Sequence, residues 1–263
     1  MMRLSDMERI VFNLEMLADW HIGSGYGRPG DVDALVARDD HGLPYVPAKT
    51  LTGILRDACE QVAYGLDDGY PAGSWSAWVT YVFGSQPSAK DAAPVHRPVA
   101  AALSVRPACF PDGIRSELVK ASETDAEWGS ALRQAVTFIK PGVSLDAQTG
   151  QSVEKCLRMV EMARGGVVLH ADAQLSVSGL SSEQRHCALA LLAAGCRLVE
   201  RIGGKRRRGS GRVALSMSAV DVDEKEEIEW IAARAAEIPL PPEPSAEAIL
   251  PVLDAADAPR KWS

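Results

Sequence analysis

The sequence predicts an α+β protein, and three patterns carry this prediction. Residues 9–18 partly alternate apolar with polar side chains, which is typical of a strand half buried in a sheet. Apolar residues at helical spacing indicate a helix after Pro47: Leu51, Leu55, Ala58 and Val62. The apolar run 188–194 indicates a second, buried helix. With 263 residues, 46% of them apolar and 24% charged, the chain is long enough for one large domain or two small ones.

The N-terminal part predicts a strand, a glycine loop, a short strand, a turn and a helix. Residues 19–30 contain four glycines and a proline, which favours an open loop. A short strand is expected at 33–38 and a turn at 39–42. An extended approach at 43–47 then leads into the helix, which we expect to end at Gly65.

The middle of the chain predicts an insertion and a projecting hairpin. Short helices are expected within an insertion at about 66–98, which contains Gly, Pro, Ser and apolar-aromatic clusters. Residues 100–110 have the pattern of a buried strand, and 120–135 that of a helix or a loop. Two or three strands within 136–177 enclose a polar segment. We therefore expect a projecting hairpin, or thumb, at about 138–170.

The C-terminal part begins with a second long helix. Ser181 and Gln184 have the spacing of a capping box, in which each side chain bonds to the other residue's backbone N–H. We expect this helix to end at the glycine pair 203–204. Residues 212–217 then alternate as a strand.

The negative charge of the chain lies at its C-terminal end. There are 35 acidic and 28 basic residues, and 11 of the acidic but only 4 of the basic ones fall within 221–263. Residues 1–220 therefore hold 24 of each and are neutral. We expect one folded domain at 1–220 and a separate acidic, proline-containing tail, with a helix near 228–238. A neutral body binds phosphate where its cations converge on one face.

The sequence lacks a long apolar segment and paired cysteine motifs, which bears on the expected compartment and cofactors. The longest near-apolar run, 188–194, is far shorter than the roughly 20 residues that span a bilayer, so we expect a cytoplasmic protein without a membrane partner. The five cysteines form no Cys-x-x-Cys pair and are odd in number. We therefore expect buried thiols, with neither a disulfide framework nor a structural zinc ion.

The basic segment 203–211, Gly-Gly-Lys-Arg-Arg-Arg-Gly-Ser-Gly, is the most specific feature. Glycines let the backbone approach a ligand closely, and Lys and Arg neutralise phosphates. The segment follows a helix and lacks the nucleotide P-loop pattern, which favours a polyanion over a mononucleotide. The alternative is a solvated surface loop with chance basicity. The expected phosphate contacts are Lys205, Arg206, Arg207, Arg208 and Arg212.

Three residues in and after the first glycine loop are candidates for cleavage chemistry. Asp31 and Asp33 would share a face if they lie on a strand, because residues two apart do so. A carboxylate beside RNA is electrostatically costly unless it holds a metal ion or acts on the 2′-hydroxyl. Turn chemistry is the favoured alternative for Asp31 and an equal one for Asp33. His21 is a candidate acid or base, although a packed structural histidine is the more common case.

Lys49 and Thr50 stand at the predicted helix start, with Arg56 further along the same helix. A helix N-terminus with an added lysine binds phosphate readily. A simple helix cap explains the same residues equally well.

Taken together, these segments resemble the RAMP superfamily of CRISPR-associated proteins. The motifs occur in the family's order: His-Ile-Gly-Ser-Gly at 21–25, Val-Asp-Ala-Leu-Val-Ala-Arg-Asp at 32–39, the stretch 42–56 and the late glycine loop. Further matches are Ser-Val-Arg at 104–106 and a thumb-like segment at 138–150. The likeness covers residues 10–217 and is closest to the repeated backbone subunit of type III effector complexes.

The resemblance implies a ferredoxin-like, RNA-recognition-like core with an inserted helical region and a projecting thumb, in one RAMP domain at 1–220. It implies partners as well: guide RNA, complementary target RNA, further copies of the chain and other effector subunits. Asp33 matches an aspartate needed for target cleavage with Mg²⁺ or Mn²⁺. The guide-binding surface matches 205–208, Lys49 and Thr50, and Lys140 lies in the matching thumb.

The chain departs from the family pattern in three places. Ala48-Lys49-Thr50 stands where the family has serines and a small residue, the late loop is more basic than usual, and the acidic tail has no counterpart. Overall we expect a guide-RNA-binding backbone subunit that cleaves target RNA in antiviral defence. Two alternatives stay open: a non-catalytic assembly subunit of the same complex, and a guide-processing endoribonuclease with His21 as general base.

Overall fold

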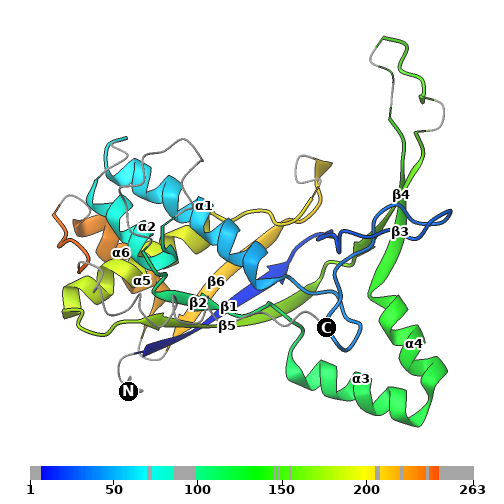
Figure 1. Ribbon diagram of the computed structural model, residues 1–263, viewed down its shortest axis with the longest axis horizontal. Coiled ribbons are helices and arrows are strands. Elements are labelled where there is room, and N and C mark those ends of the chain that lie inside the picture. The colour runs from blue at the N-terminus through cyan, green and yellow to red at the C-terminus, as the bar shows by residue number, and fades with distance from the viewer. Residues whose placement is uncertain are drawn as a thin grey trace, which may run out of the picture.

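A four-stranded antiparallel sheet forms the centre of the computed structural model (Figure 1), which describes residues 7–69, 73–85, 99–144, 146, 148–153, 156–204, 208–219, 222–234 and 237–242. Its strands are β1 (Met7–Met16), β2 (Leu103–Val105), β5 (Val167–Ser176) and β6 (Val213–Ala219). They lie in the order β2-β5-β1-β6. Both neighbours of β1 run antiparallel to it, with Leu14 opposite Leu169 on one side and Leu215 on the other.

Two long helices complete a ferredoxin-like core. The order along the chain is β1, α1 (Ala48–Leu66), β2, β5, α5 (Ser182–Leu198) and β6, with further elements inserted between β2 and β5. This is the β-α-β-β-α-β succession of that fold, and the strand order places the third strand beside the first. The α+β, ferredoxin-like prediction is confirmed.

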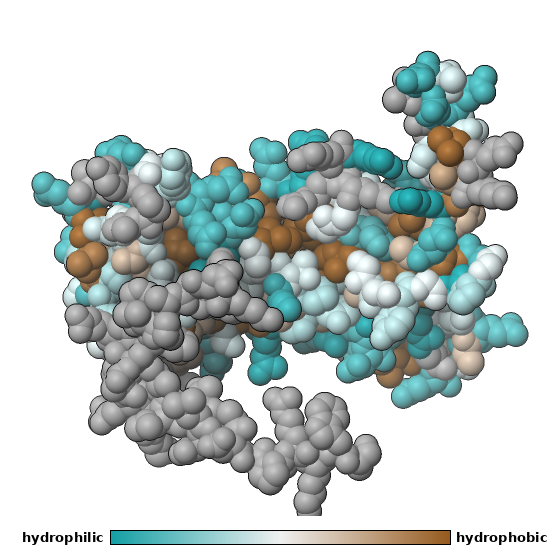
Figure 2. Space-filling model, turned by 45° about the horizontal axis from the view of Figure 1, so that its top comes forward, coloured by the Kyte–Doolittle hydropathy of each residue, from teal (hydrophilic) through white to brown (hydrophobic). Residues whose placement is uncertain are grey.

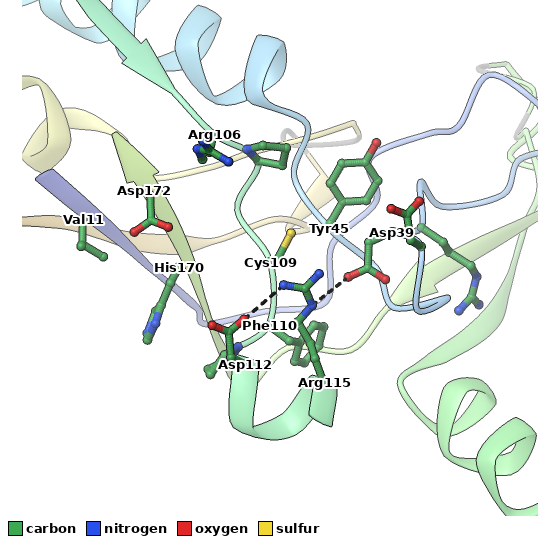
Figure 3. Close-up of a pocket in the computed structure, with 14 residues that line it drawn as sticks. Val11, Asp39, Tyr45, Arg106, Cys109, Phe110, Asp112, Arg115, His170 and Asp172 are labelled. Carbon is green, nitrogen blue, oxygen red and sulfur yellow. Dashed lines mark hydrogen bonds and ion pairs between the residues drawn. The ribbon is translucent and has the colours of Figure 1, made fainter. Parts of the chain in front are cut away.

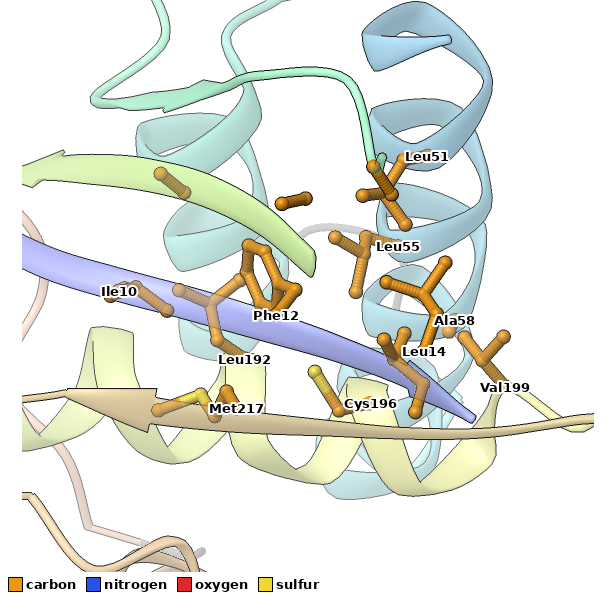
Figure 4. Close-up of a cluster of buried hydrophobic side chains, with 14 of the residues drawn as sticks. Ile10, Phe12, Leu14, Leu51, Leu55, Ala58, Leu192, Cys196, Val199 and Met217 are labelled. Atoms are coloured by element: carbon orange, nitrogen blue, oxygen red, sulfur yellow. The ribbon is translucent and has the colours of Figure 1, made fainter. Parts of the chain in front are cut away.

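The helices cover one face of the sheet, and the core lies between them and the strands. Alternate residues of β1 are buried: Ile10, Phe12, Leu14 and Met16. Figure 4 shows Ile10, Phe12 and Leu14 in one cluster with Leu51 and Leu55 of α1 and Leu192 and Cys196 of α5, and Met16 belongs to the same core. Apolar residues at every second position of the strand lie on one face of the sheet, and those at helical spacing lie on one face of each helix. These faces pack against one another to form the core. This burial of apolar surface is the main stabilising contribution to the fold.

The two helices end at other residues than the sequence predicts. Helix α1 continues through Gly65 to Leu66, and the glycine that follows it in a left-handed conformation is Gly69, whose N–H donates to Tyr64 O at 2.8 Å. Helix α5 has the predicted capping box between Ser181 and Gln184, but it ends at Leu198. The chain leaves the helix early because residues 199–202 run beside the start of β6.

Three elements depart from their predicted outline. Strand β2 is only three residues long, because Pro107 has no N–H to continue a ladder. The segment 120–135 is helical in two pieces, α3 (Asp112–Thr124) and α4 (Ala126–Ala135), and Asp125 between them caps α4 through its side chain. Residues 33–38 form isolated bridges and no regular strand.

The fold has an inserted helical region and a thumb, as predicted, although residues 70–72 and 86–98 of the predicted insertion lie outside the described residues. Helix α2 (Ser74–Phe83) lies in the insertion and buries Trp75 and Trp78 against the core. The thumb is a two-stranded antiparallel hairpin of β3 (Thr137–Gly142) and β4 (Arg158–Ala163). Figure 1 shows it projecting from the end of the molecule where α3 and α4 also lie. Its base ends at Ala163, since residues from 167 onward belong to the central sheet as β5.

The acidic C-terminal segment begins as part of the folded body. Helix α6 (Glu224–Arg234) packs on α5, burying Ile231, and its Glu224 pairs with Arg197 at 2.6 Å. Glu227 is also buried and bonds to His186 Nδ1 at 2.9 Å. Pro239 and Leu240 accept hydrogen bonds from Trp78 Nε1 and Gln184 Nε2. Helix α6 is acidic in sequence, but apolar residues spaced along it pack against the core.

Candidate RNA-binding site

The two ends of the late glycine loop lie side by side. Arg201 and Arg212 face each other as a bridge, and Ile202 N–H donates to Gly211 O at 2.8 Å. Gly203 and Gly211 both have positive φ, at 76° and 73°. A β-carbon on Gly211 would collide with Ile202 O, and one on Gly203 would collide with His21 O. Both positions therefore require glycine.

The two glycine loops are joined by backbone hydrogen bonds. Gly204 N–H donates to His21 O at 2.9 Å, and Gly211 N–H donates to Asp19 O at 2.8 Å. Leu17 N–H donates to Arg212 O at 2.9 Å. The first loop and the basic loop therefore form one continuous surface at the end of β1, although nearly two hundred residues of sequence separate them.

The cations of the basic loop can be placed only in part. Lys205, Arg206 and Arg207 lie outside the described residues. Arg208 and Arg212 are exposed. Within the described part of the chain neither has an ion-pair partner, so both guanidinium groups are available to an anion at this surface.

The start of α1 lies over the same end of the sheet. Figure 1 shows the start of α1 near the end of β1, and Figure 4 shows Ala58, further along the same helix, beside Leu14. No side chain caps the helix N-terminus at Pro47, and the first turn contains no acidic residue. Lys49 is exposed and Thr50 half-buried. Uncapped backbone N–H groups beside a lysine favour an anion.

Arg56, another predicted RNA contact, has protein partners instead. Its guanidinium pairs with Glu60 at 2.7 Å and donates to Gly84 O at 3.1 Å. Its side chain therefore ties α1 to the end of α2, which points to a structural role. Lys140 is exposed on strand β3 of the thumb, away from α1.

Asp33 is fixed to the base of the thumb. Its N–H donates to Met159 O at 2.8 Å, and its Oδ2 accepts from Met159 N–H at 2.6 Å. The residue is exposed, and no partner is recorded for its second oxygen, Oδ1, among the described residues. One carboxylate oxygen is thus available at the surface of strand β4.

Asp31 lies in a turn, which is the alternative favoured for it from the sequence, and it does not alternate with Asp33 along a strand. Residues 28–32 close through Val32 N–H donating to Arg28 O at 2.9 Å, and Asp31 pairs with Arg28 Nε at 2.9 Å. Gly30, with φ 78°, allows the reversal. Both aspartates still line one open pocket of about 450 Å³ with Leu157 and Met159.

His21 is a packing residue at the junction of three segments. Its Nδ1 lies 2.7 Å from Glu161 O on β4, so Nδ1 carries the proton and donates. Its own carbonyl oxygen accepts from Gly204 N–H, as above. A β-carbon on Gly23 would approach its Nε2 to 3.2 Å. The histidine therefore joins the first loop, the late loop and the thumb. This is the structural role that the sequence offers as the alternative to catalysis.

Glu161 is an anchor of the thumb that the sequence analysis missed. Its buried carboxylate pairs with Arg38 at 2.6 Å and accepts from Val36 N–H at 3.0 Å. Arg38 also donates to Thr137 Oγ1 at 2.9 Å, on the partner strand. Burial raises the pKa of Glu161, but these hydrogen bonds and the Arg38 charge outweigh it and hold the pKa below its ordinary value. Glu161 lies among polar thumb residues in the sequence, and no sequence pattern distinguishes this buried glutamate from solvent-exposed glutamates.

A cavity of about 700 Å³ lies elsewhere, on the sheet face opposite the helices (Figure 3). Arg115 there pairs with Asp112 at 3.2 Å and with Asp39 at 3.6 Å. His170 and Asp172 of β5 line its other side. Because its charges are mixed and partly paired with one another, this cavity is a poor phosphate site.

The donor set around Asp33 suits only a weakly held cation. Among the described residues no cluster of three or more His, Cys, Asp or Glu side chains could hold a metal ion. Asp33 offers one oxygen, while Asp31 is paired with Arg28. Mg²⁺ is commonly held by one or two carboxylates together with substrate phosphates, so the residues fit an ion that arrives with RNA.

No helix in the described ranges combines the length and apolar character needed to cross a membrane.

The cysteines are free thiols: Cys59, Cys187 and Cys196 are buried, and Cys109 and Cys156 are half-buried. Burial raises the pKa of Cys187 to about 12, so this thiol stays protonated.

Comparison with models of protein families identifies one family. The model of the RAMP superfamily matches residues 13–214. A chain of type III-B Cmr-beta bound to cognate target RNA is similar with a TM-score of 0.53 and 12% identity, covering 84% of this chain and 98% of that one. A chain of type III-B Cmr-beta in its apo state has a TM-score of 0.51 and 13% identity, covering 81% and 97%. At such identities the likeness shows the fold. No curated protein matches the chain.

Proposed function

Because the chain belongs to the RAMP superfamily, we propose that it is a guide-RNA-binding backbone subunit of a type III CRISPR effector complex. The observation that carries the proposal is the joining of the two glycine loops by backbone hydrogen bonds, with Arg208 and Arg212 exposed at the late loop. A fold shared with a chain of an RNA-bound type III-B assembly supports it.

The mode of binding is contact with the phosphate backbone. Arginine guanidinium groups and helix N-terminal amides recognise phosphate oxygens and do not read bases. The neutral body of the chain attracts RNA only where its cations gather, which is at the basic loop and Lys49. Guide RNAs of unrelated sequence are therefore bound alike.

We also propose target RNA cleavage at Asp33. Its carboxylate is exposed, and its two hydrogen bonds to Met159 fix it at the base of the thumb. In the proposed reaction a target 2′-oxygen attacks the adjacent phosphorus, and the bond to the 5′-oxygen breaks. Asp33 Oδ1 either accepts the 2′-hydroxyl proton or holds a divalent cation against the phosphate. When bound, that cation, Mg²⁺ or Mn²⁺, would neutralise the charge developing on phosphate oxygens.

A non-catalytic assembly subunit is the second candidate. It is favoured by the bonds of Asp33 to Met159, because these alone would account for an aspartate at this position. The guide-processing alternative with His21 as base has less support, since that ring is packed at a junction of segments. Incubating the lone protein with precursor guide RNA in the absence of metal tests it: specific cutting would favour processing.

RNA binding is tested by titrating labelled single-stranded RNAs of unrelated sequence into the purified protein. Replacing Arg208 and Arg212 together by Gln should weaken binding to every sequence by the same factor. The matched control is Arg9→Gln, because Arg9 is also exposed but lies at the other end of β1. Loss of binding to some sequences only, or equal losses in the control, would contradict the proposal.

A further inference from the structure

Tyr26, in the first glycine loop, is an aromatic residue that the fold leaves in solvent. Its side chain is 78% exposed, compared with 60% for Tyr64 and 58% for Trp128. Among the described residues its ring stacks on no other ring and its hydroxyl has no hydrogen-bond partner. An aromatic ring in water stabilises the fold little, because it buries little apolar surface. The ring is therefore available to a ligand.

The backbone around Tyr26 is held in place although its side chain is exposed. Tyr26 O accepts from Leu35 N–H at 2.9 Å, and Tyr26 N–H donates to Ser24 Oγ at 3.2 Å. A β-carbon on the next residue, Gly27, would collide with Asp33 O. The loop thus closes tightly on both sides of Tyr26. A tyrosine presented in this way loses little conformational entropy when its ring binds a partner.

An open pocket begins at the residue that follows Tyr26. This is the pocket of about 450 Å³ that both aspartates line, and Gly27, Leu157 and Met159 line it too. Leu157 lies just beyond the paired strands of the thumb and is 61% exposed. Figure 2 shows apolar side chains on the stalk of the thumb below a hydrophilic tip. Glycine backbone and apolar side chains together suit a flat, apolar group.

The charges of the pocket disfavour a phosphate group as its occupant. Among the described residues that line it the cation is Arg28, which pairs with Asp31 at 2.9 Å. Asp33 therefore leaves the lining with a net negative charge, which repels phosphate. A nucleobase is uncharged, and every base has a π-face that stacks on an aromatic ring. The base is thus the part of an RNA chain that suits this surface.

A base held in this pocket also places its own ribose near Asp33. The 2′-hydroxyl belongs to the ribose that carries the base, and Asp33 lines the same pocket. Fixing the reacting hydroxyl against the group that acts on it accelerates a reaction strongly. Removing a base from its stack is costly, and stacking on an aromatic ring offsets part of that cost.

We propose that Tyr26 and this pocket form a subsite for the base of the target nucleotide whose 2′-hydroxyl reacts. Tyr26 is a positioning residue that stacks on the base, and it takes no part in proton transfer. The subsite accepts any base, because stacking does not read hydrogen-bonding groups. The inference rests on the proposed cleavage at Asp33 and adds a contact to the target base, whereas the basic loop contacts phosphates.

Cleavage of two target RNAs under single-turnover conditions tests the subsite in a reconstituted complex. One target is ordinary, and the other carries an abasic ribonucleotide at the cleaved position, so it keeps the 2′-hydroxyl. Tyr26→Ala should slow cleavage of the ordinary target about tenfold with target affinity unchanged, and should match the wild type on the abasic target. Tyr26→Phe should cleave like the wild type, because the ring stacks and the hydroxyl does not.

Two further variants separate the pocket from surface aromatics in general. Leu157→Trp should slow cleavage of the ordinary target, because the larger side chain narrows the pocket; Leu157 is exposed, so folding should be preserved. Tyr64→Ala is the matched control, since Tyr64 is also an exposed tyrosine but lies on α1. It should cleave both targets like the wild type.

A fluorescence measurement tests the subsite without relying on cleavage. The fluorescent base 2-aminopurine is placed in turn at each position of the target, on a nucleotide that lacks the 2′-hydroxyl and cannot react. Stacking on a tyrosine ring quenches its emission. At one position per bound copy, the Tyr26→Ala complex should therefore be brighter than the wild type, the Tyr26→Phe complex and the Tyr64→Ala complex.

The outcomes distinguish this subsite from the proposed function. Equal emission from the wild type and Tyr26→Ala at every position would overturn the subsite. So would a Tyr26→Ala variant that cleaves the ordinary target at the wild-type rate, or one that is slowed equally on both targets. If the wild type shows the fluorescence difference but cleaves neither target, the proposed cleavage fails while the base contact stands.

Discussion

Asp33 holds the backbone of Met159 at two points, donating its N–H to Met159 O at 2.8 Å and accepting the Met159 N–H on Oδ2 at 2.6 Å. This contact links the loop after β1 to strand β4 of the thumb, across more than a hundred residues. It also sets the orientation of the one carboxylate that we propose for cleavage.

Two substitutions of Asp33 distinguish its hydrogen bond to Met159 from its proposed role in cleavage. Asp33→Asn keeps an oxygen that accepts from Met159 N–H but removes the charge, while Asp33→Ala removes both. In a reconstituted complex, both variants should lose target cleavage by at least roughly 10²-fold with target binding intact. The control is Asp31→Asn in the same pocket, which should cleave normally. Wild-type cleavage rates in Asp33→Asn would show that the carboxylate is only structural.

Neutralising the basic loop should change the salt dependence of RNA binding. Replacing residues 205–208 by Gln removes four cations. Each lost phosphate contact should lower the slope of log K against log salt by roughly 0.7 for single-stranded RNA. The measurement is a set of titrations between low and physiological salt with several sequences. An unchanged slope, or a loss confined to one sequence, would remove this loop from the RNA surface.

The late loop should not tolerate a β-carbon at Gly211. Its φ is 73°, and Ile202 O occupies the space that a side chain would need. Gly211→Ala should therefore destabilise the protein by about 1–3 kcal/mol or more, measured by urea unfolding. Gly53→Ala serves as the control, because that position is helical and open, and it should be neutral or stabilising by up to about 1 kcal/mol. Equal effects at the two positions would count against the turn described here.

Stability should fall in acid through Glu161. Its pKa is lowered in the folded protein, so its contribution is complete above the unfolded value of about 4.3 and is lost as the pH falls through the folded value. Glu161→Gln should lower stability at neutral pH by about 1–3 kcal/mol and flatten the decline below that range. Unfolding curves at a series of pH values measure both effects. An acid decline identical to that of the wild type would assign the pH dependence to other groups.

The core was predictable because it rests on local periodicity. Alternation in residues 9–18 and helical spacing from Leu51 to Val62 both mark faces that have to be buried, whatever the tertiary arrangement. The capping box at Ser181 is likewise a local pattern, and it is present. Helix ends were less predictable: Gly203 and Gly204 read as a helix stop, but pairing of residues 199–202 with the chain before β6 ends α5 sooner.

The candidate site depends on contacts that sequence cannot display. The glycines of the two loops were apparent, but the bonds from Gly204 to His21 and from Gly211 to Asp19 join segments far apart in the chain. Glu161 and Arg38 form their buried pair only once the thumb is placed against the first loop. Arg56 shows the reverse case, since a cation at the expected position is paired with Glu60 instead.

The most direct test of the central claim is the native mass of the effector complex purified through this chain. A guide-RNA backbone subunit predicts one guide RNA with several copies of the chain, whose number rises as the guide is lengthened. A complex without RNA, or one holding a single copy at every guide length, would contradict that account.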